Sequence, residues 1–279
     1  MLSYRHAFHA GNHADVLKHL CLYLVLRYYN RKDKPYWYID THAGAGCYSI
    51  NSTYAQKTGE YEQGFARLLT SEKPLVSPLN DFVQTIQTIT HNQAIYLGSP
   101  LIAAHLLREK DKIRLFEKHT TDFPILNQAC QSYRHKTIIK QEDGFQGLIS
   151  LLPPPTRRAV TLIDPSYETE DDYHQVSGTL KKALKRFANG CYMVWYPMLN
   201  KEGSQQLPEQ LKKIAPHYLN AILQVKGHSD NGFGMNGSGM FIINPPYLLA
   251  EELEQALPQL VEILQQDQHA SYALQNQTE

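Results

Sequence analysis

Seven short apolar runs, rich in β-branched and aromatic residues, alternate with longer stretches of helical periodicity along this chain. The runs cover residues 36–40, 113–117, 137–140, 159–164, 191–196, 218–226 and 240–244. Strands that alternate with helices form βαβ units, which build a mostly parallel sheet with helices on both faces. The sequence therefore predicts an α/β, doubly wound fold with a seven-stranded sheet.

The connection between the first two runs, residues 41–112, is much longer than a single crossover helix requires. Helical periodicity within 47–97 predicts a small helical subdomain inserted into a main domain formed by 1–46 and 98–279. Ser99, which precedes a proline, is expected to cap the helix that follows the insertion.

The sequence predicts different structures for the two ends of the chain. Asn12 is a suitable N-cap for a helix that runs to about Tyr29, with Asp15 in its first turn. A final helix over 248–264 precedes a Gln/Asn-rich tail, which we expect to be frayed. The glycine-rich connection 227–239 is expected to be mobile.

Composition excludes some classes of function. The 27 Lys and Arg residues balance 27 Asp and Glu residues, so this is no strongly basic, nonspecific nucleic-acid binder. The N-terminus lacks the layout of a signal peptide, and no apolar run is long enough to span a membrane. We therefore expect a cytoplasmic protein with no membrane association, and we expect it to be a monomer.

Four cysteines and a group of N-terminal histidines raise the question of a metal site. The cysteines form no C-x-x-C pair, which argues against a zinc knuckle or a disulfide scaffold. His6, His9, His13 and His19 could share one helix face only if Gly11 and Asn12 did not interrupt it. The sequence therefore predicts no metal.

Three acidic residues end successive strands and point to a nucleotide-like cofactor. Asp40 begins the segment DTHAGAG, Glu117 ends the second strand, and Asp143-Gly144 follows the third. A carboxylate at such a position can accept from ribose hydroxyls or an exocyclic amine. The third glycine of the dinucleotide fingerprint is missing, which disfavours an NAD-linked oxidoreductase, and the chain has no P-loop.

The fourth strand ends in Asp164-Pro165-Ser166-Tyr167, which resembles the [DNS]-P-P-[YFW] motif of S-adenosylmethionine-dependent amino-methyltransferases. A ring amine is a poor nucleophile because its lone pair is delocalised. A carboxylate and a backbone carbonyl that accept its N–H bonds localise that pair, while an aromatic side chain stacks on the flipped base. Ser166 departs from this motif.

A second segment, Asn244-Pro245-Pro246-Tyr247, matches the motif better by letter. In this class the last strand is antiparallel to the others, so its end points away from the cofactor. We therefore assign the catalytic role to the segment that begins at Asp164.

Further motifs narrow the resemblance to the RlmJ family of 23S rRNA adenine-N6 methyltransferases. They are the opening LSYRHAFHAGNHADVLKH, DTHAGAG, GSPLIA, LLRE, DGF, WYP and INPP, in the family's order from the first residue to about residue 250. The resemblance implies a Rossmann-like class I methyltransferase fold with a helical insertion, S-adenosylmethionine as the cofactor and 23S rRNA as the substrate.

The resemblance also implies roles for individual residues. The catalytic group comprises Asp164, Pro165 and Tyr167. The cofactor contacts are His19, His42, Ser99, Glu117, Asp143, Gly144 and Asp164, and the substrate-side groups are Tyr4, His6 and Lys18. The segment that carries Tyr4 and His6 is expected to be mobile and to become ordered over the flipped adenine.

Two rival functions remain open at this stage. One is a DNA adenine methyltransferase or a protein involved in the use of external DNA, because base flipping serves either polymer. The other is a noncatalytic RNA-binding module that keeps the fold. The sequence feature that suggests it is Ser166, which replaces the second proline of the motif.

Overall fold

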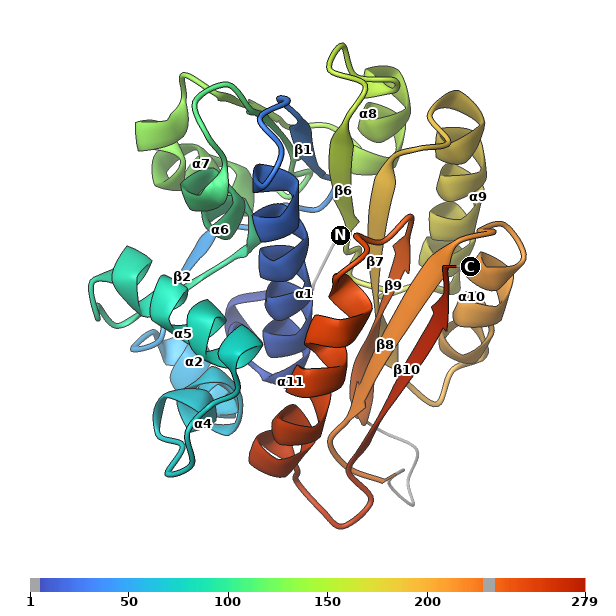
Figure 1. Cartoon of the computed structure of the whole chain (residues 1–279). Coiled ribbons are helices and arrows are strands. Elements are labelled where there is room, and N and C mark those ends of the chain that lie inside the picture. Colours follow the sequence, from blue (N-terminus) through green and yellow to red (C-terminus); the bar gives the residue numbers. More distant parts are fainter. Residues whose placement is uncertain (1–5, 228–233, 279) are drawn as a thin grey trace.

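The computed structural model describes residues 6–227 and 234–278 of the chain, and its main sheet has eight strands within those ranges (Figure 1). The spatial order is β10-β8-β9-β7-β6-β1-β4-β5. The strands are β1 Trp37–Asp40, β4 Lys112–Phe116, β5 Thr137–Lys140, β6 Ala159–Ile163, β7 Cys191–Met198, β8 Tyr218–Gln224, β9 Gly237–Ile243 and β10 Ser271–Gln277.

The predicted α/β architecture is confirmed, including an antiparallel seventh run. β5, β4, β1, β6 and β7 pair in parallel, whereas β9 runs antiparallel to both β7 and β8. The carboxyl ends of the five parallel strands therefore share one edge, where ligands bind in open α/β sheets.

The expectation of a frayed C-terminal tail is wrong. Residues 271–277 form β10, which pairs antiparallel with β8 in a register that places Tyr272 opposite Leu223. Leu274 of β10 packs against the core. Strand pairing uses the backbone N–H and C=O groups at the open edge of β8, so it does not require apolar side chains. A polar segment such as residues 271–277 can therefore form the edge strand.

Helices cover both faces of the sheet. Helices α1 His13–Asn30, α6 Ser99–Leu106, α7 Asp122–Ala129 and α11 Leu249–Leu264 contribute to one core, while α8 Gly144–Leu151, α9 Glu170–Arg186 and α10 Glu202–Lys212 pack in the other. The Asn12 carboxamide oxygen caps α1 as predicted, accepting from the amides of Ala14 and Asp15 at 3.0 Å each. Two short 3₁₀ turns, His6–Phe8 (η1) and Gln131–Tyr133 (η2), complete the helical elements.

The long connection after β1 contains β2 Cys47–Ser49, α2 Thr53–Thr58, α3 Glu60–Gln63, α4 Phe65–Leu69, α5 Ser77–Thr90 and β3 Ile95–Leu97. β2 and β3 pair antiparallel where this segment leaves and re-enters the main fold. The segment does not have a core of its own, because Phe65, Phe82 and Tyr96 belong to the same buried cluster as α1 and α11. The division of the chain at 47–97 stays a prediction.

Within the described ranges, none of the helices combines the length and the apolar character that crossing a membrane would require.

Candidate functional site

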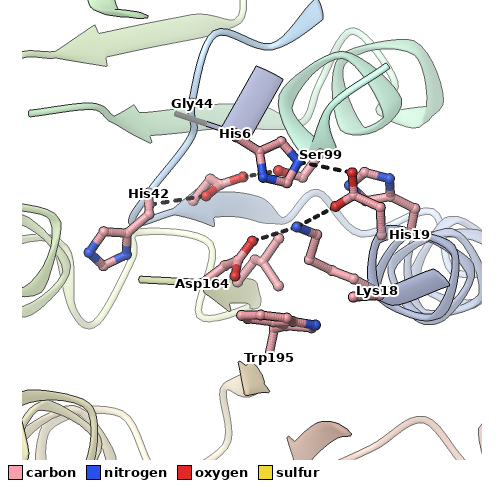
Figure 2. Close-up of polar contacts among 12 residues, drawn as sticks. His6, Lys18, His19, His42, Gly44, Ser99, Asp164 and Trp195 are labelled. Carbon is pink, nitrogen blue, oxygen red and sulfur yellow. Dashed lines mark hydrogen bonds and ion pairs between the residues drawn. The ribbon is translucent and has the colours of Figure 1, made fainter. Parts of the chain in front are cut away.

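A cavity of about 220 Å³ opens at the shared carboxyl edge of the parallel strands. Most of the residues assigned from the sequence line it: His6, Lys18, His19, His42, Ser99, Glu117, Asp143, Gly144, Asp164 and Pro165. They come from η1, from α1 and from the segments that follow β1, β3, β4, β5 and β6. Figure 2 shows His6, Lys18, Ser99 and Asp164 gathered around one space. Tyr4 lies outside the described residues.

Glu117 fixes the glycine-containing turn that follows β1. Its Oε2 accepts from the Gly44 amide at 2.7 Å, and its Oε1 accepts from the His119 amide at 2.6 Å. Burial raises the pKa of Glu117 above its usual range. Gly44 has φ +61, a conformation that favours glycine. The carboxylate therefore lies at the cavity wall in a fixed orientation.

Asp143 and Gly144 form the start of α8 at the same wall. Asp143 Oδ1 caps the helix by accepting from the amides of Phe145 and Gln146 at 3.1 and 3.2 Å. A Cβ at Gly144 would lie 1.8 Å from the Thr41 carbonyl oxygen. Glycine is required here by this close approach to the β1 loop.

Asp40 does not line the cavity, so the expectation that all three strand-end acids face the cofactor is wrong for this residue. Its side chain is fully buried, and its Oδ2 accepts from the hydroxyls of Ser99 and Tyr38 at 2.7 Å each. Burial raises the pKa of Asp40 to about 6. Asp40 therefore positions the start of α6 and, by accepting from the His42 amide, the loop after β1.

The expected N-cap of α6 is also corrected. Gly98 occupies the N-cap position, and Ser99 is the first helical residue. The Ser99 hydroxyl donates to Asp40. Both Gly98 and Ser99 still line the cavity. The helix thus begins at the cavity wall, where its N-terminal amides and dipole favour an anionic group.

Lys18 joins α1 to the motif after β6. Its Nζ lies 2.6 Å from Asp164 Oδ2 and 2.8 Å from Asp15 Oδ1, and Figure 2 shows it between the two carboxylates. Burial lowers the pKa of Lys18, but Asp15 and Asp164 outweigh this effect and hold that pKa above its usual range. Lys18 is therefore a permanent cation that fixes the Asp164 carboxylate.

Asp15 continues these contacts to the N-terminal segment. Its Oδ2 lies 2.9 Å from His6 Nε2 and accepts from the Gly11 amide at 2.9 Å. Burial opposes ionisation of Asp15, yet His6 and Lys18 hold its pKa well below the usual range. His6 also packs edge-on against Tyr48, with ring centroids 5.1 Å apart.

His19 and His42, which also line the cavity, are held neutral. Burial lowers the pKa of His19 to about 3 and that of His42 to about 4. His19 Nδ1 lies 2.8 Å from the Tyr96 hydroxyl, which belongs to β3 of the insertion. His42 packs edge-on against Phe145 at 4.8 Å. Both are available as neutral donors or acceptors.

Tyr167 does not line the cavity in this conformation. Its side chain is 2% exposed, packs between Tyr173 and Trp195, and donates a hydrogen bond of 2.6 Å to the Trp195 carbonyl. Its φ of +52 is unusual for an aromatic residue. The role of Tyr167 as a stacking platform stays a prediction.

The competing motif lies at the opposite edge of the sheet. The Asn244 side-chain amide donates to the carbonyls of Ala188 and Gly190 at 2.7 and 2.8 Å, just before β7 begins. Asp164 instead follows the end of β6. Chain direction thus separates the two motifs as expected from the antiparallel strand.

Asp15 and Trp195 are among the residues of the site that carried no functional assignment from the sequence. Asp15 lies three residues before Lys18, a helical spacing that is a visible signal for an ion pair. Trp195 lies under Asp164 and Lys18 in Figure 2, with Lys18 Nζ 5.7 Å from its ring centroid. Its only signal was the WYP motif. Among residues 6–227 and 234–278, no group of three His, Cys, Asp or Glu side chains could hold a metal ion.

Comparison with known proteins identifies the family. The family model described as "Ribosomal RNA large subunit methyltransferase D, RlmJ" matches residues 33–275. A protein named ribosomal RNA large subunit methyltransferase J from Escherichia coli (strain K12) is 41% identical over 266 residues, covering 93% of each chain. The protein of the same name from Haemophilus influenzae is 41% identical over 268 residues, covering 95% of this chain and 94% of the relative.

A solved structure agrees with this result. The crystal structure of a Legionella pneumophila protein is 33% identical, with a TM-score of 0.89, and covers 97% of this chain and 99% of that chain. Sequence and fold therefore agree over nearly the whole length. The chain belongs to the RlmJ family of ribosomal RNA large subunit methyltransferases.

Proposed function

We propose that this protein transfers a methyl group from S-adenosylmethionine to N6 of an adenine in 23S rRNA. The observation that carries the proposal is the Asp164 carboxylate, fixed by Lys18 at 2.6 Å, at the wall of the cavity after β6. The relatives named as large subunit rRNA methyltransferases support the polymer class. The assignment of adenine N6 as the methylated atom is based on the motif at residues 164–167.

The cavity provides suitable groups for an adenosyl cofactor. Glu117 lies where a carboxylate can accept from ribose hydroxyls. Asp143 caps α8 with Oδ1, and its Oδ2 lies 3.5 Å from Lys118 Nζ beside the cavity. The start of α6 suits the methionine carboxylate. When bound, S-adenosylmethionine would supply an electrophilic methyl group. The bond from this carbon to N6 would form as its bond to sulfur breaks, with the sulfur keeping that electron pair and the N6 proton passing to solvent.

The residues of this chain act on the adenine amine. The ion pair with Lys18 occupies Asp164 Oδ2, which leaves Oδ1 to accept one N6–H bond. The Pro165 carbonyl accepts the other, so the lone pair of the amine points toward the methyl group. Buried Lys18 excludes water from this side and keeps the carboxylate in one orientation.

The test is methyl transfer from labelled cofactor to 23S rRNA isolated from cells that lack the gene, followed by mass mapping of the methylated nucleotide. We expect one N6-methyladenine, and none with Asp164→Ala. Transfer to DNA of the same sequence but not to RNA would support the DNA methyltransferase instead. RNA binding without transfer would support the noncatalytic module.

A further inference from the structure

The inserted segment contacts the N-terminal segment through one carboxylate. Glu60 of α3 lies with its Oε1 2.9 Å from His9 Nδ1, and its Oε2 accepts from the Asn12 side-chain amide at 2.8 Å. The same Asn12 side chain caps α1 with its oxygen. Glu60 therefore binds two residues just before the first helical residue of α1, the helix that carries Lys18.

Two further hydrogen bonds fix the same junction. The Phe65 amide donates to the Gly11 carbonyl at 2.8 Å, and the Thr58 hydroxyl donates to the Phe8 carbonyl at 2.6 Å. A Cβ at Gly64 would lie 2.1 Å from the Gly11 carbonyl oxygen. The insertion and the N-terminal segment thus approach as closely as their backbones allow.

Residues 6–12 form consecutive turns that transmit this position to the cavity. The His9 amide donates to the His6 carbonyl at 2.8 Å, and the Asn12 amide donates to the His9 carbonyl at 3.0 Å. His6 in turn contacts Asp15, which holds Lys18. A displacement of His9 or Asn12 therefore moves His6 relative to the ion pair with Asp164.

We infer that Glu60 is a positioning residue for methyl transfer, acting through His9 and Asn12 to hold His6 and the start of α1 at the catalytic carboxylate. This inference rests on the proposed function of the same site. The charges of the two residues agree with this inference. The hydrogen bond to Glu60 raises the pKa of His9. Burial raises the pKa of Glu60, but the contact with His9 outweighs this effect and the net shift is a lowering. The contact is therefore an ion pair at mildly acidic pH.

The first experiment compares Glu60→Ala with Glu62→Ala, an exposed glutamate of the same helix. We expect Glu60→Ala to lower the single-turnover rate on 23S rRNA about tenfold, since two hydrogen bonds to a charged group are lost. The calorimetric Kd for S-adenosylmethionine should stay within about threefold. Glu60→Gln keeps an oxygen for Asn12 and should recover much of the rate, whereas Glu62→Ala should match the parent protein.

The second experiment is a double-mutant cycle with His6→Ala. If Glu60 acts through the N-terminal segment, the double variant loses less than the product of the two single losses, because the effects of residues in one network do not add. Multiplied losses, or an unchanged rate in Glu60→Ala, would overturn the inference.

Amide hydrogen exchange over residues 9–12 separates this inference from the proposed function. Faster exchange in Glu60→Ala than in Glu62→Ala supports the positioning contact even if no rRNA is methylated, in which case the proposed function alone is wrong. Equal exchange in the two variants would show that Glu60 does not hold the segment.

Discussion

Glu117 combines two tasks at the scale of a single residue, since it fixes the Gly44 and His119 amides and faces the cavity. Glu117→Ala should weaken S-adenosylmethionine binding by roughly 1.5–3 kcal/mol, the range for hydrogen bonds to a charged group. Isothermal calorimetry measures the change, with Glu142→Ala on the exposed surface after β5 as the control. Equal affinities in both variants would contradict the assignment of Glu117.

The two proline-containing motifs can be separated by one pair of substitutions. Asp164→Ala should abolish methylation of 23S rRNA, because it removes the acceptor and leaves Lys18 without that partner. Asn244→Ala should keep most of the methyl transfer while costing about 1–2 kcal/mol of stability, since Asn244 holds two carbonyls and has φ +52. Label transfer and urea unfolding measure the two effects; activity lost only in Asn244→Ala would move the active site to β9.

Some residues of the site were predictable because their motifs are local. Asp164 and Pro165 follow a strand, and Glu117 and Asp143 follow two others, so the common edge of a parallel sheet brings them together. The contact between Lys18 and Asp164 joins residues far apart in sequence, and no local pattern encodes it. The buried position of Tyr167 likewise depends on Trp195 and Tyr173.

At the scale of elements, two glycines offer a matched test of how the insertion docks. Gly64→Ala places a Cβ against the backbone of Gly11 and Asn12, so it should displace the insertion and lower methyl transfer about tenfold or more. Gly178→Ala meets nothing within 4 Å on α9 and should stabilise the protein by roughly 0.5–1 kcal/mol. Thermal unfolding and single-turnover rates distinguish them; a fully active Gly64→Ala would show that the junction tolerates movement.

The elements differ in how well the sequence predicts them. The runs that form β6 and β7 are buried and apolar, which makes them visible as strands. β10 is polar and mostly exposed, and its pairing with β8 is a tertiary contact. The sequence does not predict β2 and β3 for the same reason. Each strand is only three residues long and forms by pairing with the other.

At the scale of the whole molecule, buried histidines make stability depend on pH. Burial lowers the pKa of His13 to about 4 and that of His19 to about 3. Below the ordinary value of about 6.5, the unfolded chain binds protons that the folded chain does not, so stability is lost as the pH falls toward 4. The loss is on the order of 2 kcal/mol for each of these residues at about pH 5.

Urea unfolding at about pH 7.5 and about pH 5 measures this loss. His13→Gln should reduce the difference between the two midpoints, whereas His174→Gln, on the exposed face of α9, should leave it unchanged. Equal midpoints of the parent protein at the two pH values would contradict the buried, neutral state of His13 and His19.

The core shared by α1, α11 and the residues between β2 and β3 has a consequence for how this protein can change over time. Phe65 and Phe82 pack in the same cluster as Leu17 and Leu253, so neither side of that contact can change volume alone. Recombination that exchanged residues 47–97 between relatives would pack them against α1 and α11 of a different protein, whose side chains had diverged separately. We expect such chimeras to fold only when α1 and α11 come from the same parent protein as residues 47–97. These separate stretches of sequence must therefore be exchanged together.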